Sequence, residues 1–326
     1  MIFLIANSTL AALIILVNLI VFLMFRFKPR LTEKPSNHLL QSLSACDLVS
    51  GIVVVLHIII GQYPGIDSFA IRVGADILKT WLVESSALHL VFITGDRALS
   101  LFYALRYRDI VTRRSIKMLI VWIWLVPFLT SACQLLYLYP YFNDKQLSEE
   151  MEENIANVEV IYSIVSFIVY MLIPLVIMFL AFFSMFYEIK KLLLRTPSTG
   201  QLPTPRVSWQ QRRVIYIFGA MYMCFVFLAI PYFTLRVYID IQMWKNKEIA
   251  VSRTTLEILY VLKTATSLFN PLLYSGLNRE FRAYIILCIK GIMERGGTTL
   301  RRQEPMSNDT PTTRSRILSL EDEAQA

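Results

Sequence analysis

The feature that most constrains this chain is a series of seven apolar runs, each long enough to cross a lipid bilayer as a helix. A spanning helix needs about 20 predominantly apolar residues. We expect the spans at residues 2–25, 37–60, 73–96, 116–139, 158–187, 213–236 and 254–277. Hydrophobic residues make up 56% of the 326 positions, more apolar surface than a water-soluble domain could bury. The sequence therefore predicts an all-α membrane protein built as a bundle of seven transmembrane helices.

The charged residues between the runs predict the orientation of the chain. Basic residues follow the first, third, fifth and seventh runs, including Arg26, Lys28, Arg30, Arg106, Arg108, Arg113, Arg114, Lys190, Lys191, Arg279 and Arg282. The segment 140–157 carries instead Asp144, Glu149, Glu150, Glu152 and Glu153. Because basic loops stay in the cytoplasm, we expect a multi-pass plasma-membrane protein with its N-terminus outside and its C-terminus in the cytoplasm. Only Met1 precedes the first run, so we expect the N-terminus to be incomplete.

The third run differs from the others because it carries Asp76, Lys79, Glu84 and His89 at membrane depth. Such side chains usually face the interior of a helix bundle, since exposing them to lipid is costly. At the helical rise, Lys79 and Arg97 are about 27 Å apart along the axis. The face between them holds Lys79, Val83, Ser86, Leu90, Ile93 and Arg97. A buried polar face that joins two membrane surfaces suits a protein that carries information, or a solute, across the membrane.

Several short motifs stand in order along the runs. The first three runs hold Asn18, Leu43-Ser44-Ala45-Cys46-Asp47-Leu48 and Asp96-Arg97-Ala98. The later part holds Trp122, Ile173-Pro174-Leu175, Phe225, Pro231, Asn270-Pro271-Leu272-Leu273-Tyr274 and Phe281. In this order the motifs resemble those of the rhodopsin-like (class A) G-protein-coupled receptors, over nearly all of residues 1–292. The resemblance implies a receptor, not an enzyme, that transduces an extracellular ligand signal to a heterotrimeric G-protein.

The resemblance implies three functional regions. We expect a ligand site at Asp76, Lys79, Thr80, Ser166, Tyr170, Tyr232, Arg236 and Tyr260. A sodium ion would bind at Asp47, Ser86, Ser267 and Asn270. A protonated Asp47 that only packs the bundle is an equally good interpretation. The activation switch and G-protein contact would involve Asp96, Arg97, Phe225, Pro231, Asn270, Pro271 and Tyr274. The alternative for Asp96 and Arg97 is an ordinary ion pair at the membrane interface.

The C-terminal part predicts two further segments. Phe281, Tyr284, Ile285 and Cys288 recur at helical spacing opposite basic residues, which indicates an amphipathic helix at about 278–292 on the inner leaflet. Cys288 is a candidate lipidation site, although an unmodified thiol fits nearly as well. Residues 293–326 are predicted to be a disordered cytoplasmic tail. By the resemblance, a receptor kinase and arrestin would act on this tail; an inert, solvated tail is the alternative.

Four positions depart from the family pattern. Arg72 stands where the family has a cysteine that forms a disulfide with the second outer loop, and residues 140–157 contain no cysteine. We expect that segment to be mobile and its acids to pair with Arg72. Ala98, Phe182 and Ala229 replace a tyrosine, a tyrosine and a tryptophan of the family's activation contacts. These departures predict altered contacts during activation and leave open a seven-helix protein that no longer signals.

The charges in the outer half of the bundle bear on the ligand. Amine receptors of the family have an aspartate where this chain has Lys79, and a cation there would repel an ammonium group. Lys79, Arg236 and Lys263 would instead attract a carboxylate. The favoured alternative is that the buried charges pair internally. The acids available for such pairs are Asp76, Glu84 and Glu257.

Lys263 also raises the question of retinal. Opsins attach retinal to a lysine six residues before the asparagine that corresponds to Asn270, and that position is Thr264 here. One residue turns a helical side chain by about 100°. Covalent retinal is therefore not expected, and no cofactor besides sodium is predicted.

Other protein classes fit the sequence less well. Intramembrane charges would suit a transporter, but seven spans without a visible inverted repeat do not favour one. The motifs of zinc proteases and of serine hydrolases are missing from the sequence, which argues against an enzyme. The net charge of +8 comes from basic residues that flank the apolar runs, so we expect membrane lipid and no nucleic acid as a partner.

Overall fold

The structure is a computed structural model that describes residues 2–63, 68–143, 148–194, 216–217, 219–245, 247 and 251–277. Over these residues the chain forms helices and turns, without strands. The predicted fold class, an all-α bundle of long apolar helices, is confirmed. The predicted amphipathic helix at 278–292, Cys288 and the tail at 293–326 lie outside the described residues.

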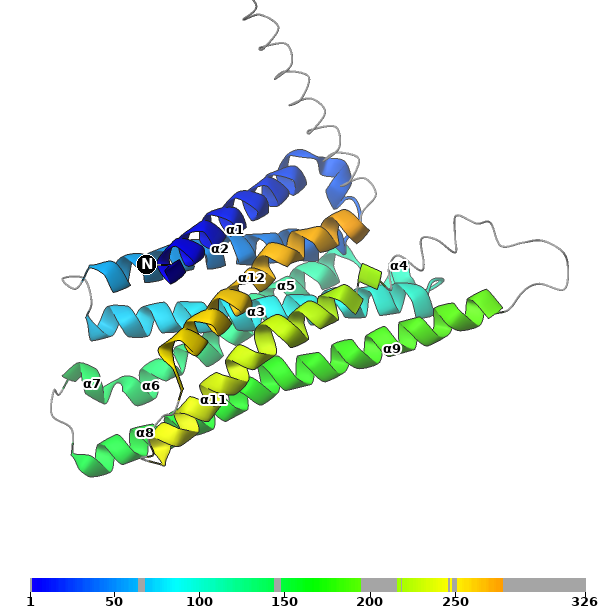
Figure 1. Cartoon of the computed structure of the whole chain (residues 1–326). Helices are drawn as coiled ribbons and strands as arrows, with labels where there is room; N and C mark the ends of the chain where they lie inside the picture. Colours follow the sequence, from blue (N-terminus) through cyan, green and yellow to red (C-terminus); the bar gives the residue numbers. More distant parts are fainter. Residues whose placement is uncertain are drawn as a thin grey trace, which may run out of the picture. The chain divides into compact units, whose positions relative to one another are not determined.

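Eight helices of at least 15 residues make up most of the described chain (Figure 1). They are α1 (Ile2–Phe27), α2 (Asn37–Gln62), α3 (Phe69–Phe102), α5 (Arg113–Ala132), α8 (Glu149–Phe167), α9 (Ile173–Leu194), α11 (Ile230–Trp244) and α12 (Arg253–Leu277). Short connecting helices are η1 (Pro29–Thr32), α4 (Tyr107–Ile110), α6 (Gln134–Leu138) and α7 (Pro140–Asn143). Two π-helical segments, η2 (Ile168–Leu172) and η3 (Phe225–Ala229), lead into α9 and α11.

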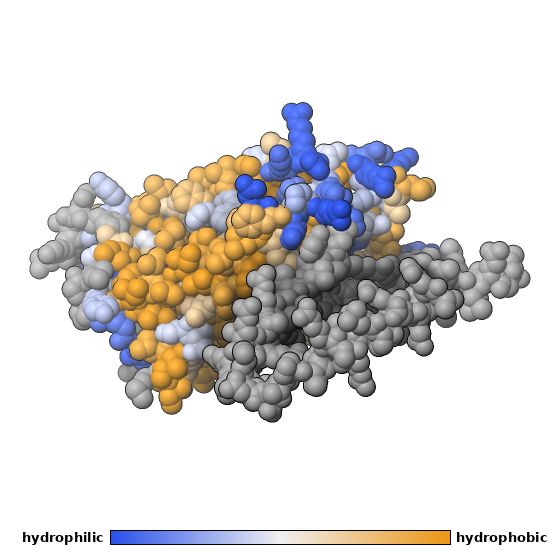
Figure 2. Space-filling model, turned by 90° about the horizontal axis from the view of Figure 1, so that it is seen from above, coloured by the Kyte–Doolittle hydropathy of each residue, from blue (hydrophilic) through white to orange (hydrophobic). Residues whose placement is uncertain are grey.

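Six helical stretches of the described chain are long and apolar enough to cross a membrane. They are Ile2–Phe27, Asn37–Gln62, Phe69–Phe102, Arg113–Leu138, Glu149–Lys191 and Gly219–Trp244. Helix α12, which covers the predicted seventh span, has 25 residues and is not among these six stretches. Figure 2 shows a broad hydrophobic surface between hydrophilic residues that gather toward its edges, as expected of a bundle surrounded by lipid.

Several helices extend past the apolar runs because capping groups, rather than hydropathy, set their ends. Ser68 accepts a hydrogen bond from the backbone N–H of Ile71 and starts α3 before the predicted residue 73. Ser148 caps α8 through the N–H of Met151, and three glutamates in the first turn complement the helix dipole. Within the segment 140–157, residues 140–143 and 149–157 are helical. Its mobility and the pairing of its acids with Arg72 stay predictions.

The two π-helical segments stand directly before prolines. Pro174 lies near the start of α9 and Pro231 near the start of α11. A proline removes one backbone hydrogen bond and its ring crowds the carbonyl four residues earlier. The wider i→i+5 turn of η2 and η3 accommodates this crowding within otherwise continuous helices.

Helix α3 lies at the centre of the bundle, where it packs against α2, α5, η2 and α9. Close packing of α1 on α2 is made at Gly51, where an added Cβ would come within 2.8 Å of Ile15 Cγ1. Asn18 joins α1 to α12, because its side-chain amide donates to the carbonyl of Ser267 over 3.2 Å. The polar residues Glu84, His89 and Asp96 of α3 are buried, so they lie inside the bundle, away from lipid.

Candidate functional site

Seven charged side chains line a cavity of about 220 Å³, which we call the charged cavity. It lies between α3, α6, α8, η2, α11 and α12, so residues far apart in the sequence meet there. All eight residues that the sequence analysis proposed for ligand binding line it: Asp76, Lys79, Thr80, Ser166, Tyr170, Tyr232, Arg236 and Tyr260. The structure thus brings the proposed ligand site together, while ligand binding itself stays a prediction.

Two of the three predicted cations of this region are paired with acids. Lys79 Nζ lies 2.5 Å from Asp76 Oδ1, and Arg236 Nε lies 3.2 Å from Asp240 Oδ1. Asp240 also accepts a 2.6 Å hydrogen bond from Ser163, which ties α11 to α8. Internal pairing is thus correct for Lys79. It is wrong for Glu257, which pairs with Arg253 on the exposed end of α12.

Glu84 forms no ion pair with any described residue. Its carboxylate accepts hydrogen bonds from Thr130 at 3.2 Å and Ser131 at 3.3 Å, both on α5. Thr130 in turn shares a 2.9 Å hydrogen bond with Tyr170. The side chain is only 3% exposed, and its second oxygen, Oε1, has no hydrogen-bond partner among the described residues. A buried carboxylate with an unused acceptor is energetically unfavourable unless something else donates to it.

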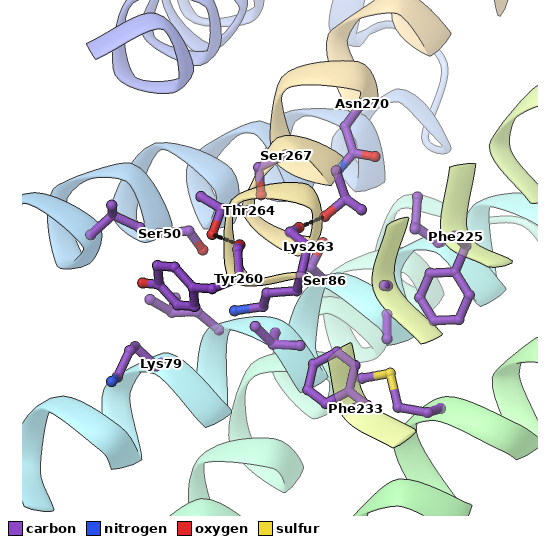
Figure 3. A pocket seen from close by; sticks show the side chains of 18 of the residues that line it. Ser50, Lys79, Ser86, Phe225, Phe233, Tyr260, Lys263, Thr264, Ser267 and Asn270 are labelled. Carbon is purple, nitrogen blue, oxygen red and sulfur yellow. Dashed lines mark hydrogen bonds between the residues drawn. The ribbon is translucent and has the colours of Figure 1, made fainter. Parts of the chain in front are cut away.

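Lys263 projects from α12 toward aromatic rings. Its Nζ lies 5.6 Å from the ring centroid of Tyr232 and 5.5 Å from that of Tyr260, within the range of cation–π contacts. Figure 3 shows Lys263 beside Tyr260 in a smaller adjoining cavity of about 60 Å³. Tyr260 also faces His57, whose Nδ1 lies 3.4 Å from Lys79 Nζ. Thr264, the position of the opsin lysine, donates instead to the carbonyl of Tyr260.

The residues proposed for sodium binding lie deeper in the bundle. Asn270 donates a 2.8 Å hydrogen bond to Asp47 Oδ2, and Asp47 Oδ1 has no hydrogen-bond partner in the described part of the chain. Asp47 is fully buried. Ser86, Ser267 and Asn270 all line the smaller cavity (Figure 3). Hydroxyl, amide and carboxylate oxygens are suitable ligands for a hard cation, so these residues fit a sodium ion.

The other end of α3 holds a second polar cluster. Arg97 Nε lies 3.5 Å from Asp96 Oδ2, and Tyr107 of α4 donates a 2.6 Å hydrogen bond to Asp96 Oδ1. Burial and this hydrogen bond raise the pKa of Tyr107 to about 12, so the phenol stays protonated at physiological pH. Tyr107 was missed as a functional residue, because it lies outside the apolar run and only the α3–α4 turn brings it to Asp96.

The remaining residues of the proposed switch are spread over the sixth span and α12. Phe225 is buried in η3 and lines the smaller cavity together with Asn270. Pro231 stands at the start of α11, and Pro271 lies within α12. The backbone of Tyr274 is helical, and its side chain lies outside the described residues. The structure therefore places Asp96 and Arg97 in one cluster and Phe225 and Asn270 in another.

The two tryptophans of α5 lie in different surroundings. Trp122 is 56% exposed, whereas Trp124 turns inward and donates to Ser42 Oγ over 2.8 Å. Ser42 is also 2.8 Å from His89 Nε2, while His89 Nδ1 lies 2.8 Å from the carbonyl of Ser85. A neutral His89 protonated on Nδ1 satisfies both contacts. The network joins α2, α3 and α5, and Trp124 is the residue that occupies the interior position.

The structure shows the surroundings of two residues that depart from the family pattern, Phe182 and Ala229. Phe182 stacks on Phe186 and faces Gly219 of the sixth span, where an added Cβ would lie 3.2 Å from its ring. Ala229 is buried at the end of η3 and lines the smaller cavity. These contacts are apolar packing contacts, and a polar switch at either position would need another residue.

Comparison with known proteins agrees with this architecture. The sequence profile described as "7 transmembrane receptor (rhodopsin family)" matches residues 17–274. The chain is similar to the histamine H2 receptor of Cavia porcellus, with 26% identity over 76% of this chain and 68% of that protein. It is similar to the histamine H2 receptor of Rattus norvegicus with 25% identity over 84% and 75%, and to that of Homo sapiens with 26% over 76% and 68%.

The chain belongs to the rhodopsin family of seven-transmembrane receptors. It is a multi-pass membrane receptor of the G-protein-coupled class, as the sequence analysis predicted, and not a transporter. Such receptors transduce the signal of an extracellular ligand through a G-protein. At this level of identity the comparisons define the family, and they do not define the ligand of this chain.

Proposed function

We propose that the ligand binds in the charged cavity and that Arg97, at the opposite end of α3, contacts the heterotrimeric G-protein. The observation that carries this proposal is the convergence of all eight proposed ligand residues on one cavity. Helix α3 contributes both Lys79 to the cavity and Arg97 to the opposite end, about 27 Å apart. A ligand that binds one conformation more tightly shifts the equilibrium at both ends, because the two ends belong to one bundle.

The orientation with the N-terminus outside and the C-terminus in the cytoplasm belongs to the same proposal. The basic residues Arg106, Arg108 and Arg113 lie near the Asp96–Arg97 cluster in the chain. Glutamates in the first turn of α8, among them Glu149 and Glu152, line a second cavity that shares Glu159 with the charged cavity. This charge asymmetry supports a cytoplasmic position for Arg97.

A sodium ion at Asp47 is supported by the unpartnered Oδ1 atom and by the neighbouring hydroxyls. Bound sodium would neutralise the buried carboxylate and, by binding the folded state, stabilise the receptor. The melting temperature of the purified receptor should be higher in sodium chloride than in choline chloride of equal ionic strength. Asp47→Asn should remove this difference, and an unchanged difference in the variant would exclude the site.

Arrestin, a receptor kinase, surrounding lipid and lipidation of Cys288 complete the proposed partners and modifications. Their support comes from the sequence alone. The segment 298–319 contains several serines and threonines, and Cys288 falls within a basic, amphipathic pattern. Both segments lie outside the described residues.

The ligand site is tested by a screen of small polar molecules with a G-protein readout. For any agonist found, Arg236→Gln and Tyr232→Ala should each lower potency at least about 10-fold, because both side chains line the cavity. The matched control is Arg253→Gln, an arginine paired on the exposed end of α12 and outside the cavity. An agonist whose potency is unaffected by both cavity variants would place the ligand site elsewhere.

An amine ligand is the second candidate. The relatives carry histamine in their names, and Lys79 is paired with Asp76, so its charge repels an ammonium group less than the sequence alone suggests. Glu84 and Glu159 add acids to the same cavity. An amine alone, however, would leave Lys263 without a counter-charge.

A further inference from the structure

The charged cavity contains three ionisable side chains that form no ion pair with a described residue. Its seven charged lining residues are Asp76, Lys79, Glu84, Glu159, Arg236, Asp240 and Lys263. Lys79 and Arg236 are paired with Asp76 and Asp240. Glu84, Glu159 and Lys263 have no partner of opposite charge within 4.0 Å in the described ranges. The cavity therefore presents two unpaired acids and one unpaired base to whatever occupies it.

Glu84 supplies an acceptor at the α5 side of the cavity. It is nearly completely buried, is held in place by Thr130 and Ser131, and keeps Oε1 without a partner. Glu84 lines the cavity, and its hydrogen bonds to Thr130 and Ser131 are long, at 3.2 and 3.3 Å, so a stronger donor in the cavity can replace one of them. A protonated nitrogen of a ligand would supply the missing donor, and the charge-assisted hydrogen bond would be strong in this buried site.

Lys263 supplies a donor at the α12 side. It faces the rings of Tyr232 and Tyr260, which hold the cation without neutralising it. A carboxylate entering between α3 and α12 would meet this ammonium, whereas Lys79 is engaged by Asp76. Glu84 lies five residues beyond Lys79 on α3, about 7.5 Å along the helix axis. The acid on α3 and the base on α12 both line the charged cavity, so one ligand in that cavity can be offered both groups.

A wider, acid-rich cavity adjoins the charged cavity and shares Glu159 and Asp240 with it. Its wall includes Glu149, Glu152 and Glu153 together with Lys245 and Lys247. An excess of acids around an entrance attracts a ligand with a positive group and disfavours a dianion. The charged cavity itself, about 220 Å³, is smaller than the sites that hold drug-sized ligands.

We propose that the charged cavity binds a small zwitterion, a molecule with a protonated amine at one end and a carboxylate at the other. The amine contacts Glu84 and the carboxylate contacts Lys263. This inference rests on the proposed function, in that it takes the charged cavity as the ligand site, and it adds the chemical class of the ligand.

The direct test uses four series of small molecules on the purified full-length receptor. Straight-chain ω-amino acids of graded length are compared with monoamines, diamines and dicarboxylic acids of matched length. Binding is measured as the rise in melting temperature with ligand concentration, because a ligand that binds the folded state stabilises it. We expect one length of ω-amino acid to stabilise the receptor at the lowest concentration, ahead of all members of the other three series.

Two variants assign the two ends of the ligand. Glu84→Gln keeps the shape and one acceptor but removes the charge, and should weaken the ω-amino acid about 30-fold or more. Lys263→Gln should weaken the ω-amino acid similarly and leave monoamines unaffected. Glu257→Gln and Arg253→Gln are the controls on α12, since this ion pair lies at the exposed end of the helix and outside the cavity. Both controls should bind the ω-amino acid as the wild type does.

Three outcomes would overturn the ligand class. Monoamines, diamines or dicarboxylic acids could stabilise the receptor as well as the ω-amino acids do. The ω-amino acids could bind with an affinity that is the same in Glu84→Gln. All four series could leave the melting temperature unchanged. None of these outcomes contradicts the proposed function. That proposal fails only if agonists found in an unbiased screen keep their potency in both Arg236→Gln and Tyr232→Ala.

Discussion

Helices α3 and α5 both qualify as membrane spans, yet they occupy opposite environments. In the most apolar stretch of α3, 56% of the residues are buried inside the protein, compared with 17% in the stretch that contains α5. Helix α3 carries buried Glu84, His89 and Asp96, whereas the outward face of α5 consists of residues such as Trp122 and Leu129.

The difference shows that charge, more than hydropathy, predicts which span is central. Polar groups in a spanning helix must find partners in the protein, and α3 finds them on α2, α4 and α5. Helix α5 contributes only its inward residues, among them Trp124 and Thr130. The helix with the charges therefore lies inside the bundle and carries both the proposed ligand residues and the proposed G-protein contact, and its neighbour shields it from lipid.

The largest expected effect comes from matched leucines on the two helices. Leu82 of α3 is 1% exposed and Leu129 of α5 is 54% exposed. Leu82→Ala leaves an unfilled space and should lower the free energy of unfolding by about 2–3 kcal/mol. Leu129→Ala only exchanges a side chain that faces lipid, so its effect should stay below about 0.5 kcal/mol. Equilibrium unfolding in mixed micelles measures both; equal losses would remove the distinction between the helices.

A second comparison uses the two tryptophans of α5. Trp124→Phe removes the hydrogen bond to Ser42 and should cost about 1–2 kcal/mol of unfolding free energy. Trp122→Phe should change it by less than about 0.5 kcal/mol, because that ring faces outward. The same unfolding measurement decides the matter. A larger loss for Trp122→Phe would mean that α5 is rotated relative to the structure.

The hydrogen bond that Tyr107 donates to Asp96 predicts a smaller effect with a defined pH dependence. Tyr107→Phe should cost about 1 kcal/mol. Because the pKa of the phenol is raised from 10.0 to about 12, its contribution is complete below about pH 10 and is lost as the pH rises through about 12. The difference between wild type and variant should thus stay constant from about pH 6 to pH 9. A difference that disappears within this range would contradict the contact.

The smallest effect is expected at the exposed ion pair of α12. Glu257→Gln breaks the 2.9 Å contact with Arg253, whose side chain is 92% exposed. Exposed pairs contribute about 0–1 kcal/mol, so the melting temperature should change by no more than about 2 °C. A larger shift would show that this end of α12 is packed against protein and would remove its use as a control for Glu84.

Much of the architecture could be predicted from the sequence because lipid imposes a simple length rule. The rule does not predict helix ends, since Ser68 and Ser148 extend α3 and α8 by capping in polar surroundings. It also does not show which of two neighbouring side chains, Trp122 or Trp124, turns into the bundle. That choice depends on the rotation of α5, which two residues of shift change by about 200°.

The candidate ligand site was predicted as a set, since helical register and family motifs place its members at similar depth. Its electrostatics were not predictable. Whether Lys79 meets Asp76 or a ligand depends on side-chain distances of a few ångströms, which the sequence does not encode locally. Glu84 was expected to join an ion pair, and it instead faces hydroxyl groups on α5.

The most direct test of the account is G-protein nucleotide exchange measured with the full-length receptor in lipid bilayers. The receptor should accelerate exchange on one class of purified heterotrimer above the receptor-free rate, and Arg97→Gln should return it to that rate. Arg253→Gln, at the other end of the bundle, should leave it unchanged. Equal exchange in wild type and Arg97→Gln, or none above the receptor-free rate with any heterotrimer or ligand, would contradict signalling through α3.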